Sequence, residues 1–281
     1  MIEANGVELC TEVFGDHNDP PILLVMGMGG SMLWWEEGFC RMLAGGGRFV
    51  IRYDHRDTGR SVTYGPRNPE YSATDLLADA AGILDAYGIP KAHVVGVSMG
   101  GALAQLLALD VPDRVLSLVL ISTSPATPGD RGLPGGSRRL NRFLAEVEVD
   151  WSDAASVVDY LVEYSRVLAG GERGFDEAAI RELARRDVKR ARDFAAAQNH
   201  GMLADEPRPR GPLSSIAAPT LVIHGTADPM FPIDHARALV DEIPTARLVP
   251  LDGAGHGLER ADWGRVAEAI LEHTGSAARM R

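Results

Sequence analysis

The stretch Ala92–Gly101 reads AHVVGVSMGG, and the interpretation of the whole chain starts from it. A β-rich run leads into Gly96-Val97-Ser98-Met99-Gly100, and the run GALAQLLAL, typical of a helix, follows. This pattern predicts a sharp strand-to-helix turn that projects the Ser98 hydroxyl above a sheet. The two flanking glycines remove side chains that would collide with neighbouring backbone. A Gly-Ser turn could be purely structural, but N–H groups at the helix start favour an anion there. We therefore predict that Ser98 is a nucleophile.

The rest of the chain alternates short apolar runs with helical patterns. Most of the apolar runs are continuous, which is typical of parallel strands covered on both faces. Strands followed by helices predict an α/β fold with a mostly parallel, doubly wound sheet. A weaker alternating stretch, Gly6–Phe14, predicts an opening hairpin through the turn GDHND. Strands are expected at residues 21–25, 49–53, 92–97, 115–122, 219–224 and 246–250, and helices at 71–87, 100–109 and 262–274.

Residues 125–214 differ from this pattern. They begin with the turn-rich stretch SPATPGDRGLPGG, become helical and charged, and contain no strand pattern. We expect a helical cap inserted between two strands of a core formed by residues 1–124 and 215–281. The cap is either a surface layer or a lid over the site.

Composition limits the possible functions. The chain has 281 residues and a formal charge of -11, which argues against a nucleic-acid partner. No signal peptide and no run long enough for a membrane span is visible, so a cytoplasmic location is expected. Cys10 and Cys40 form no metal or disulfide pattern, and we expect buried thiols. No pattern indicates a metal or organic cofactor. The oligomeric state stays open.

A serine nucleophile needs a base, which a carboxylate orients. Asp228 follows the predicted strand at residues 219–224, and His256 lies among glycines after the strand at 246–250. This order, Ser then Asp then His, is the expected one, and all three residues would meet at the carboxyl edge of the sheet. Asp228 is therefore the predicted orienting carboxylate and His256 the predicted base. Asp252 and, more weakly, Asp205 are the alternative carboxylates.

An oxyanion intermediate also needs donors, and backbone N–H groups can supply them. We predict the N–H of Met99, next to the nucleophile, and that of Met28, in the loop MGMGG after the first core strand. Apolar side chains near that loop could line a substrate pocket or belong to the core. The candidates are Gly27, Met32, Trp34 and Trp35. For His55 and His200 we expect structural roles.

These motifs together resemble the α/β-hydrolase superfamily over nearly the whole chain. DHRDTGRS at residues 54–61 resembles its D-x-R-G-x-G-x-S segment, with Asp57-Thr58 where Gly-x is usual. With VMG, VVGVSMGG and PTLVIHGTADP, this variant is most similar to the aclacinomycin methylesterase group and to the esterases and cofactor-free haloperoxidases around it. The resemblance implies a cap between the family's strands six and seven, the triad Ser98–Asp228–His256, and oxyanion donors at Met28 and Met99. Met26 stands where many relatives have His.

The expected activity is hydrolysis of a small-molecule carboxylic ester through an acyl-enzyme. A methyl ester of a bulky apolar acid is expected from the resemblance alone. Perhydrolase, thioesterase and lactonase activities use the same groups and stay open. A serine at position 98 disfavours epoxide hydrolases and haloalkane dehalogenases, whose relatives carry Asp there. A small-ligand receptor on the same fold is the non-enzymatic alternative.

Overall fold

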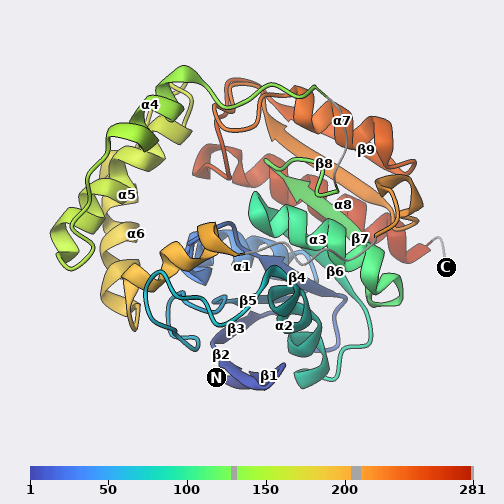
Figure 1. Cartoon of the computed structure of the whole chain (residues 1–281). Coiled ribbons are helices and arrows are strands. Elements are labelled where there is room, and N and C mark those ends of the chain that lie inside the picture. Colours follow the sequence, from blue (N-terminus) through green and yellow to red (C-terminus); the bar gives the residue numbers. More distant parts are fainter. Residues whose placement is uncertain (128–131, 204–209, 280–281) are drawn as a thin grey trace.

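A computed structural model describes residues 1–127, 132–203 and 210–279, with side chains as far as residue 275. A seven-stranded sheet crosses the molecule in the order β3-β5-β4-β6-β7-β8-β9 (Figure 1). All neighbouring strands run parallel except β3, which pairs antiparallel with β5 at one edge. The sheet strands are β3 (Thr11–Phe14), β4 (Pro21–Val25), β5 (Phe49–Tyr53), β6 (Ala92–Val97), β7 (Val115–Ile121), β8 (Thr220–Gly225) and β9 (Ala246–Leu251).

Helices cover both faces of this sheet, which explains why its central strands are continuously apolar. On one face, α2, α3 and α7 pack into a core cluster with residues such as Leu76, Leu103 and Leu239. On the other, α1 and α8 contribute Phe39 and Val266 to a second cluster. The core helices are α1 (Glu37–Gly45), α2 (Ala73–Ala86), α3 (Met99–Asp110), α7 (Asp234–Glu242) and α8 (Trp263–Arg279), with short 3₁₀ turns η1 (Met32–Trp34), η2 (Pro112–Arg114), η4 (Leu213–Ser215) and η5 (Arg260–Asp262).

The start of the chain differs from the hairpin that the sequence predicts. Strands β1 (Ile2–Ala4) and β2 (Val7–Leu9) form a separate two-stranded hairpin that turns at Asn5-Gly6. Both turn residues have positive φ (48° and 73°), the backbone geometry for which Asn-Gly is favoured in two-residue hairpins. The segment before GDHND then joins the sheet beside β5 and not beside β4. The prediction of a Gly6–Phe14 hairpin is therefore wrong.

The described part of the region between β7 and β8 contains no strand, and before the turn η4 it holds four helical elements. These are α4 (Arg138–Glu146), α5 (Ala154–Leu168), α6 (Glu177–Arg190) and the 3₁₀ segment η3 (Phe194–Met202). Helices α4, α5 and α6 stand to one side of the sheet, whereas η3 runs back across its edge (Figure 1). All four lie within residues 125–214, for which the sequence predicts a cap.

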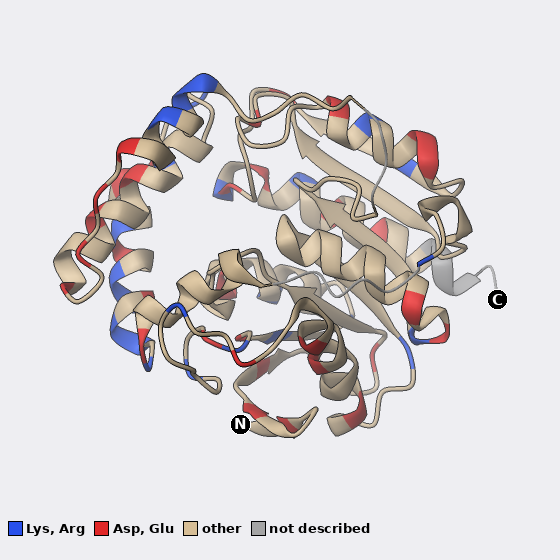
Figure 2. Cartoon of the chain, viewed as in Figure 1, with Lys and Arg blue, Asp and Glu red and all other residues tan. Residues whose placement is uncertain are grey.

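Helix α6 is charged on its outer side and tied to the core on its inner side. Lys and Arg residues occur along its length (Figure 2), and Arg185, Arg186 and Lys189 are exposed. On the inner side, Asp187 accepts a hydrogen bond from Trp34 Nε1 at 2.7 Å. One turn later, Arg190 pairs with the buried carboxylate of Asp54, also at 2.7 Å. Buried polar contacts therefore hold this part of the cap on the core.

In the part of the chain that the structure describes, no helix is both long enough and apolar enough to cross a membrane.

Candidate active site

The chain between β6 and α3 makes the sharp turn that the sequence predicts. Ser98 has φ 54° and ψ −120°, a strained backbone conformation of the kind found at functional sites. A Cβ atom on Gly96 would lie 2.2 Å from the carbonyl oxygen of Gly100, and one on Gly100 would lie 2.1 Å from that of Val25. Only glycine fits at either position. The turn thus raises Ser98 at the carboxyl end of the sheet.

The loop after β4 passes directly over this serine. A Cβ atom on Gly27 would lie 3.3 Å from the Cβ of Ser98. Within the loop, the N–H of Gly30 donates to the carbonyl of Gly27 and that of Gly29 donates to Nδ1 of His200. Among the described residues, the N–H of Met28 has no acceptor. The loop therefore presents a free backbone donor beside the candidate nucleophile.

Met99 offers the second free donor. It is the first residue of α3, where N–H groups have no partner inside the helix. No acceptor for its N–H is found in the described part of the chain. Of the two predicted oxyanion donors, Met99 follows Ser98 in the chain and Met28 follows Gly27, which packs against Ser98.

Asp228 and His256 meet across the ends of β8 and β9. Nδ1 of His256 lies 2.8 Å from Oδ2 of Asp228. The other oxygen, Oδ1, accepts the N–H groups of Met230 and Phe231 at 2.8 and 2.9 Å. Burial acts to raise the pKa of Asp228, but the hydrogen bond and charge of His256 and the Phe231 N–H outweigh it and lower that pKa. Asp228 is therefore an ionised, fixed partner for the imidazole.

Of the two alternative carboxylates, the described one, Asp252, does not take this place. The side chain of Asp252 is exposed, and His256 points its Nδ1 at Asp228 instead. Asp205 lies outside the described residues. A second histidine, His224, contacts Asp228 Oδ2 at 3.4 Å from Nε2, while the same nitrogen is 2.7 Å from the Phe231 carbonyl. Burial lowers the pKa of His224, so it is neutral beside the carboxylate.

The loop that carries His256 is held from both sides. The N–H of His256 donates to the carbonyl of Leu168 at the end of α5, and the N–H of Gly257 donates to Oγ of Ser122. Ser122 directly follows β7, whose last residue, Ile121, accepts the N–H of Ser98. The histidine is therefore anchored beside the strand end that also holds the serine.

Within the described chain, no hydrogen bond joins the Ser98 hydroxyl to His256. Such contacts are often long without substrate and shorten in the reactive complex.

The predicted pocket side chains divide into two groups. Met28 is 58% exposed, Met99 and Trp34 are half-buried, and Gly27 covers Ser98. Met32 is buried, and Trp35 is 1% exposed and stacks on Phe39 in the core. The structure therefore places Trp35 in the core instead of at the mouth of the site. It also corrects the expectation for the cysteines, because Cys40 is buried but Cys10 is only half-buried.

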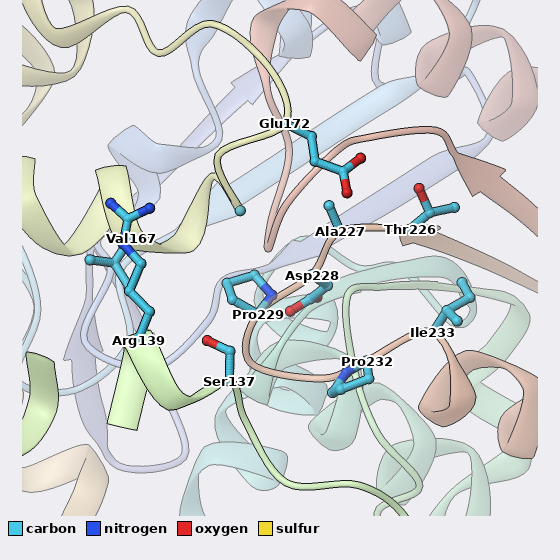
Figure 3. A pocket seen from close by; sticks show the side chains of 11 residues that line it. Ser137, Arg139, Val167, Glu172, Thr226, Ala227, Asp228, Pro229, Pro232 and Ile233 are labelled. Carbon is cyan, nitrogen blue, oxygen red and sulfur yellow. The ribbon is translucent and has the colours of Figure 1, made fainter. Parts of the chain in front are cut away.

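A cleft of about 350 Å³ lies next to Asp228 (Figure 3). Residues from α4, from the α5–α6 loop and from the loop after β8 line it, among them Arg139, Glu172 and Pro229. Neither Ser98 nor His256 belongs to its described lining. The cleft therefore reaches Asp228 but not the described surroundings of Ser98. We therefore locate the reactive centre from the strand-to-helix turn at Ser98 and not from this cleft.

Sequence reasoning missed several residues that shape the site. Leu168 and Ser122 act through a backbone carbonyl and a hydroxyl far away in the sequence, so no local signal marks them. His224 has a signal, since it is a polar residue within the apolar strand PTLVIH. His200 was assigned a structural role, yet it contacts the loop over Ser98.

Comparison with known proteins determines the family. A sequence model described as the alpha/beta hydrolase fold matches residues 20–258. The chain belongs to the α/β-hydrolase family. The esterase RhEst1 from Rhodococcus sp. ECU1013 shares this fold, with a TM-score of 0.78 at 21% identity over 98% of both chains.

Two curated relatives of this hydrolase match it over almost their whole length. It is 36% identical to the rhodomycin D methylesterase DauP of Streptomyces sp. (strain C5), and the alignment covers 99% of this chain and 98% of DauP. It is 35% identical to the rhodomycin D methylesterase DnrP of Streptomyces peucetius, with the same coverage. Together with the family, these matches identify the chain as a carboxylic-ester hydrolase.

Proposed function

We propose that this esterase hydrolyses the methyl ester of a bulky, apolar acid through an acyl-enzyme on Ser98. One arrangement carries the proposed chemistry: the strained Ser98 packs against Gly27 of the loop after β4, and His256, which the buried carboxylate of Asp228 holds, lies in a loop anchored at the end of the neighbouring strand β7. The choice of a methyl ester is supported by the two relatives named as rhodomycin D methylesterases.

In the first half of the reaction, Ser98 Oγ attacks the ester carbonyl while Nε2 of His256 takes the hydroxyl proton. Asp228 stabilises the resulting imidazolium. The carbonyl oxygen becomes an anion that accepts the N–H groups of Met28 and Met99. The tetrahedral intermediate then expels the alkoxide, which takes the proton from His256 and leaves as methanol.

In the second half, water attacks the acyl group on Ser98 and gives a proton to His256. The bond to Ser98 Oγ then breaks, and His256 returns its proton to the serine. The free acid leaves, and the site is restored. Every step uses groups of the chain and water alone.

The cap offers an aromatic surface for a bulky acyl group. Three rings from α4 and α5, those of Phe143, Tyr160 and Tyr164, stack with centroids 5.7 to 6.1 Å apart and interplanar angles of 6° to 14°. We call these rings the cap stack. Aromatic surfaces of this kind suit planar, apolar ligands.

The cap stack comes near the site through Tyr164, which lies close enough to Asp228 to feel its charge. Tyr160, Tyr164 and Leu168 follow one another at four-residue spacing on α5, so they share one side of the helix. The carbonyl of Leu168 accepts the N–H of His256. The pKa of Tyr164 is raised to about 12, mainly by burial and further by Tyr160 and the charge of Asp228. These contacts support an acyl site between the cap stack and Ser98.

The proposal is tested by comparing rhodomycin D with methyl acetate, with the product acid measured by mass spectrometry. Contacts to the large acyl group should raise kcat/KM for rhodomycin D by about 100-fold or more over methyl acetate. If rhodomycin D is recovered intact while p-nitrophenyl butyrate is cleaved, the esterase chemistry stands but the proposed acyl group is wrong.

A further inference from the structure

The loop Met26–Gly29 is held at both ends by buried histidines that the reaction does not use. His55 donates from Nε2 to the carbonyl of Met26 at 3.0 Å. His200, from the cap segment η3, accepts the N–H of Gly29 on Nδ1, also at 3.0 Å. The two imidazoles contact each other edge to face, with centroids 5.7 Å apart. The free N–H of Met28 lies between the two anchored positions.

The second nitrogen of His200 fixes its tautomer. Nε2 lies 2.8 Å from the carbonyl of Arg56, which can only accept, so Nε2 carries the proton. Nδ1 then has a free lone pair for the N–H of Gly29. Burial lowers the pKa of His200, which favours this neutral form. If His200 were protonated on both nitrogens, its Nδ1–H would face the N–H of Gly29, and neither group could accept.

The segment that carries His200 is itself anchored. The neighbouring Asn199 is fully buried and donates from Nδ2 to Oδ2 of Asp57 at 2.8 Å and to the carbonyl of Gly65 at 3.0 Å. Its Oδ1 accepts the N–H of Asn68 at 3.1 Å. Asp57 stands where relatives usually have Gly and has a φ of 64°. These hydrogen bonds from Asn199 fix η3 against residues 57–68 of the core.

The loop needs such support because of its composition. Two of its residues, Gly27 and Gly29, are glycines, a third glycine, Gly30, follows it, and Gly29 has a φ of 70°. A chain of this kind has many accessible conformations, whereas an oxyanion donor is effective only when its direction is fixed beforehand. Fixing the peptide group between Met28 and Gly29 restricts ψ of Met28 and therefore the direction of its N–H.

We propose that His200 is a positioning residue of the oxyanion hole, through which the cap fixes the N–H of Met28 over Ser98. The inference rests on the proposed acyl-enzyme mechanism. It assigns η3 a part in rate acceleration through its contact with the loop after β4.

Two substitutions separate the nitrogens of His200. An Asn side chain places its amide oxygen near the position of Nδ1, so His200→Asn can still accept from Gly29 but cannot donate to Arg56. A Gln side chain places its amide nitrogen near Nε2, so His200→Gln can donate to Arg56 but leaves the Gly29 N–H without an acceptor. Each variant loses one of the two buried hydrogen bonds of His200, so we expect the two variants to lose similar amounts of folding stability.

The experiment measures kcat and KM for p-nitrophenyl butyrate, the inhibition constant of phenylboronic acid and the melting temperature of each variant. The boronic acid forms a tetrahedral adduct with a serine, so its affinity reports on the oxyanion hole. We expect kcat of His200→Gln to fall about 10- to 100-fold with little change in KM. Its boronate inhibition constant should rise by a similar factor, and His200→Asn should recover most of both losses at a similar melting temperature.

Equal activity and equal boronate affinity in the two variants would overturn the inference, because the Gly29 contact would then have no effect on the transition state. Failure of the mechanism itself looks different. In that case wild type would neither bind the boronic acid nor depend on Ser98 for turnover.

Discussion

Asp228 uses its two oxygens for two different tasks: Oδ2 lies 2.8 Å from Nδ1 of His256, and Oδ1 accepts the backbone N–H groups of Met230 and Phe231. The backbone contacts fix the carboxylate plane, so Oδ2 always faces the imidazole. Because its surroundings lower the pKa of Asp228, the carboxyl group is ionised and can only accept hydrogen bonds. His256 must therefore carry a proton on Nδ1 and leave Nε2 free for Ser98.

Asp228→Asn should reverse this arrangement. The amide oxygen would keep the N–H groups of Met230 and Phe231, which turns the amide nitrogen toward His256. A donor at that position favours the tautomer with the proton on Nε2, which cannot accept from Ser98. We expect kcat to fall about 10³- to 10⁴-fold with the fold intact, as measured by ester turnover and circular dichroism. A loss below tenfold would show that Asp228 does not orient the base.

Gly96→Ala should destroy the elbow. Its Cβ would lie 2.2 Å from the carbonyl oxygen of Gly100, a backbone atom that cannot move without displacing α3. We expect a loss of about 3 kcal/mol or more in the free energy of unfolding, together with loss of activity. Gly264→Ala is the matched control, because a Cβ there would meet no atom within 4 Å. Urea denaturation should show it unchanged or slightly stabilised. Equal stability of the two variants would contradict the elbow geometry.

Asp187 should make stability depend on pH. Burial raises its pKa to about 6, despite hydrogen bonds from Ser31 and Trp34 that lower it. Because the unfolded carboxyl titrates near 4, the folded state binds more protons between these values. The stability from this group is complete below about pH 4 and is lost as the pH rises through 6.

Asp187→Asn has no charge to bury. Its melting temperature relative to wild type should therefore be higher at pH 7.5 than at pH 4.5, by an amount equivalent to about 2–3 kcal/mol at most. Thermal unfolding at both pH values measures this, with Asp241→Asn, at an exposed position, as control. A difference that does not change with pH would contradict the raised pKa.

Tyr164→Ala should change the choice of acyl group. Removing one ring from the cap stack should reduce kcat/KM for methyl 2-naphthoate about 5- to 20-fold, because aromatic contacts add about 0.5–1.5 kcal/mol each to the burial of apolar area. Methyl acetate does not reach the stack and should be hydrolysed at nearly the wild-type rate. Phe175, whose ring contacts Arg166 instead, offers the control Phe175→Ala. If both esters lost activity equally, the cap stack would have no role in specificity.

Much of the fold could be predicted because buried parallel strands leave a direct signal. Phe49–Tyr53 is buried at every position, and its predicted bounds agree with the structure. Helix α2 also has a clear start, since the N–H of Ser72 donates to Asp75. Helices α1 and α7 were not predicted, and neither has a side-chain cap at its first turn. Without that signal, their amphipathic patterns are easily read as loops.

The contacts within the site were harder to predict because they join distant segments. The Ser98 elbow is local, so five residues define it. In contrast, His200 and Gly29 are 171 residues apart, and nothing near either of them indicates the contact. Trp35 and Trp34 are adjacent, yet one packs in the core and the other donates to Asp187 on the cap. The two side chains differ because η1 lies between the core and the cap, which only the three-dimensional structure shows.

The most direct test of the account is the mass of the intact protein after reaction with a fluorophosphonate, in wild type and in Ser98→Ala, together with turnover of a p-nitrophenyl ester. The account predicts one adduct in wild type, located on Ser98 by peptide mapping, and loss of both the adduct and turnover in the variant. An adduct at another residue, or turnover that persists in Ser98→Ala, would contradict the assignment of Ser98 as the nucleophile.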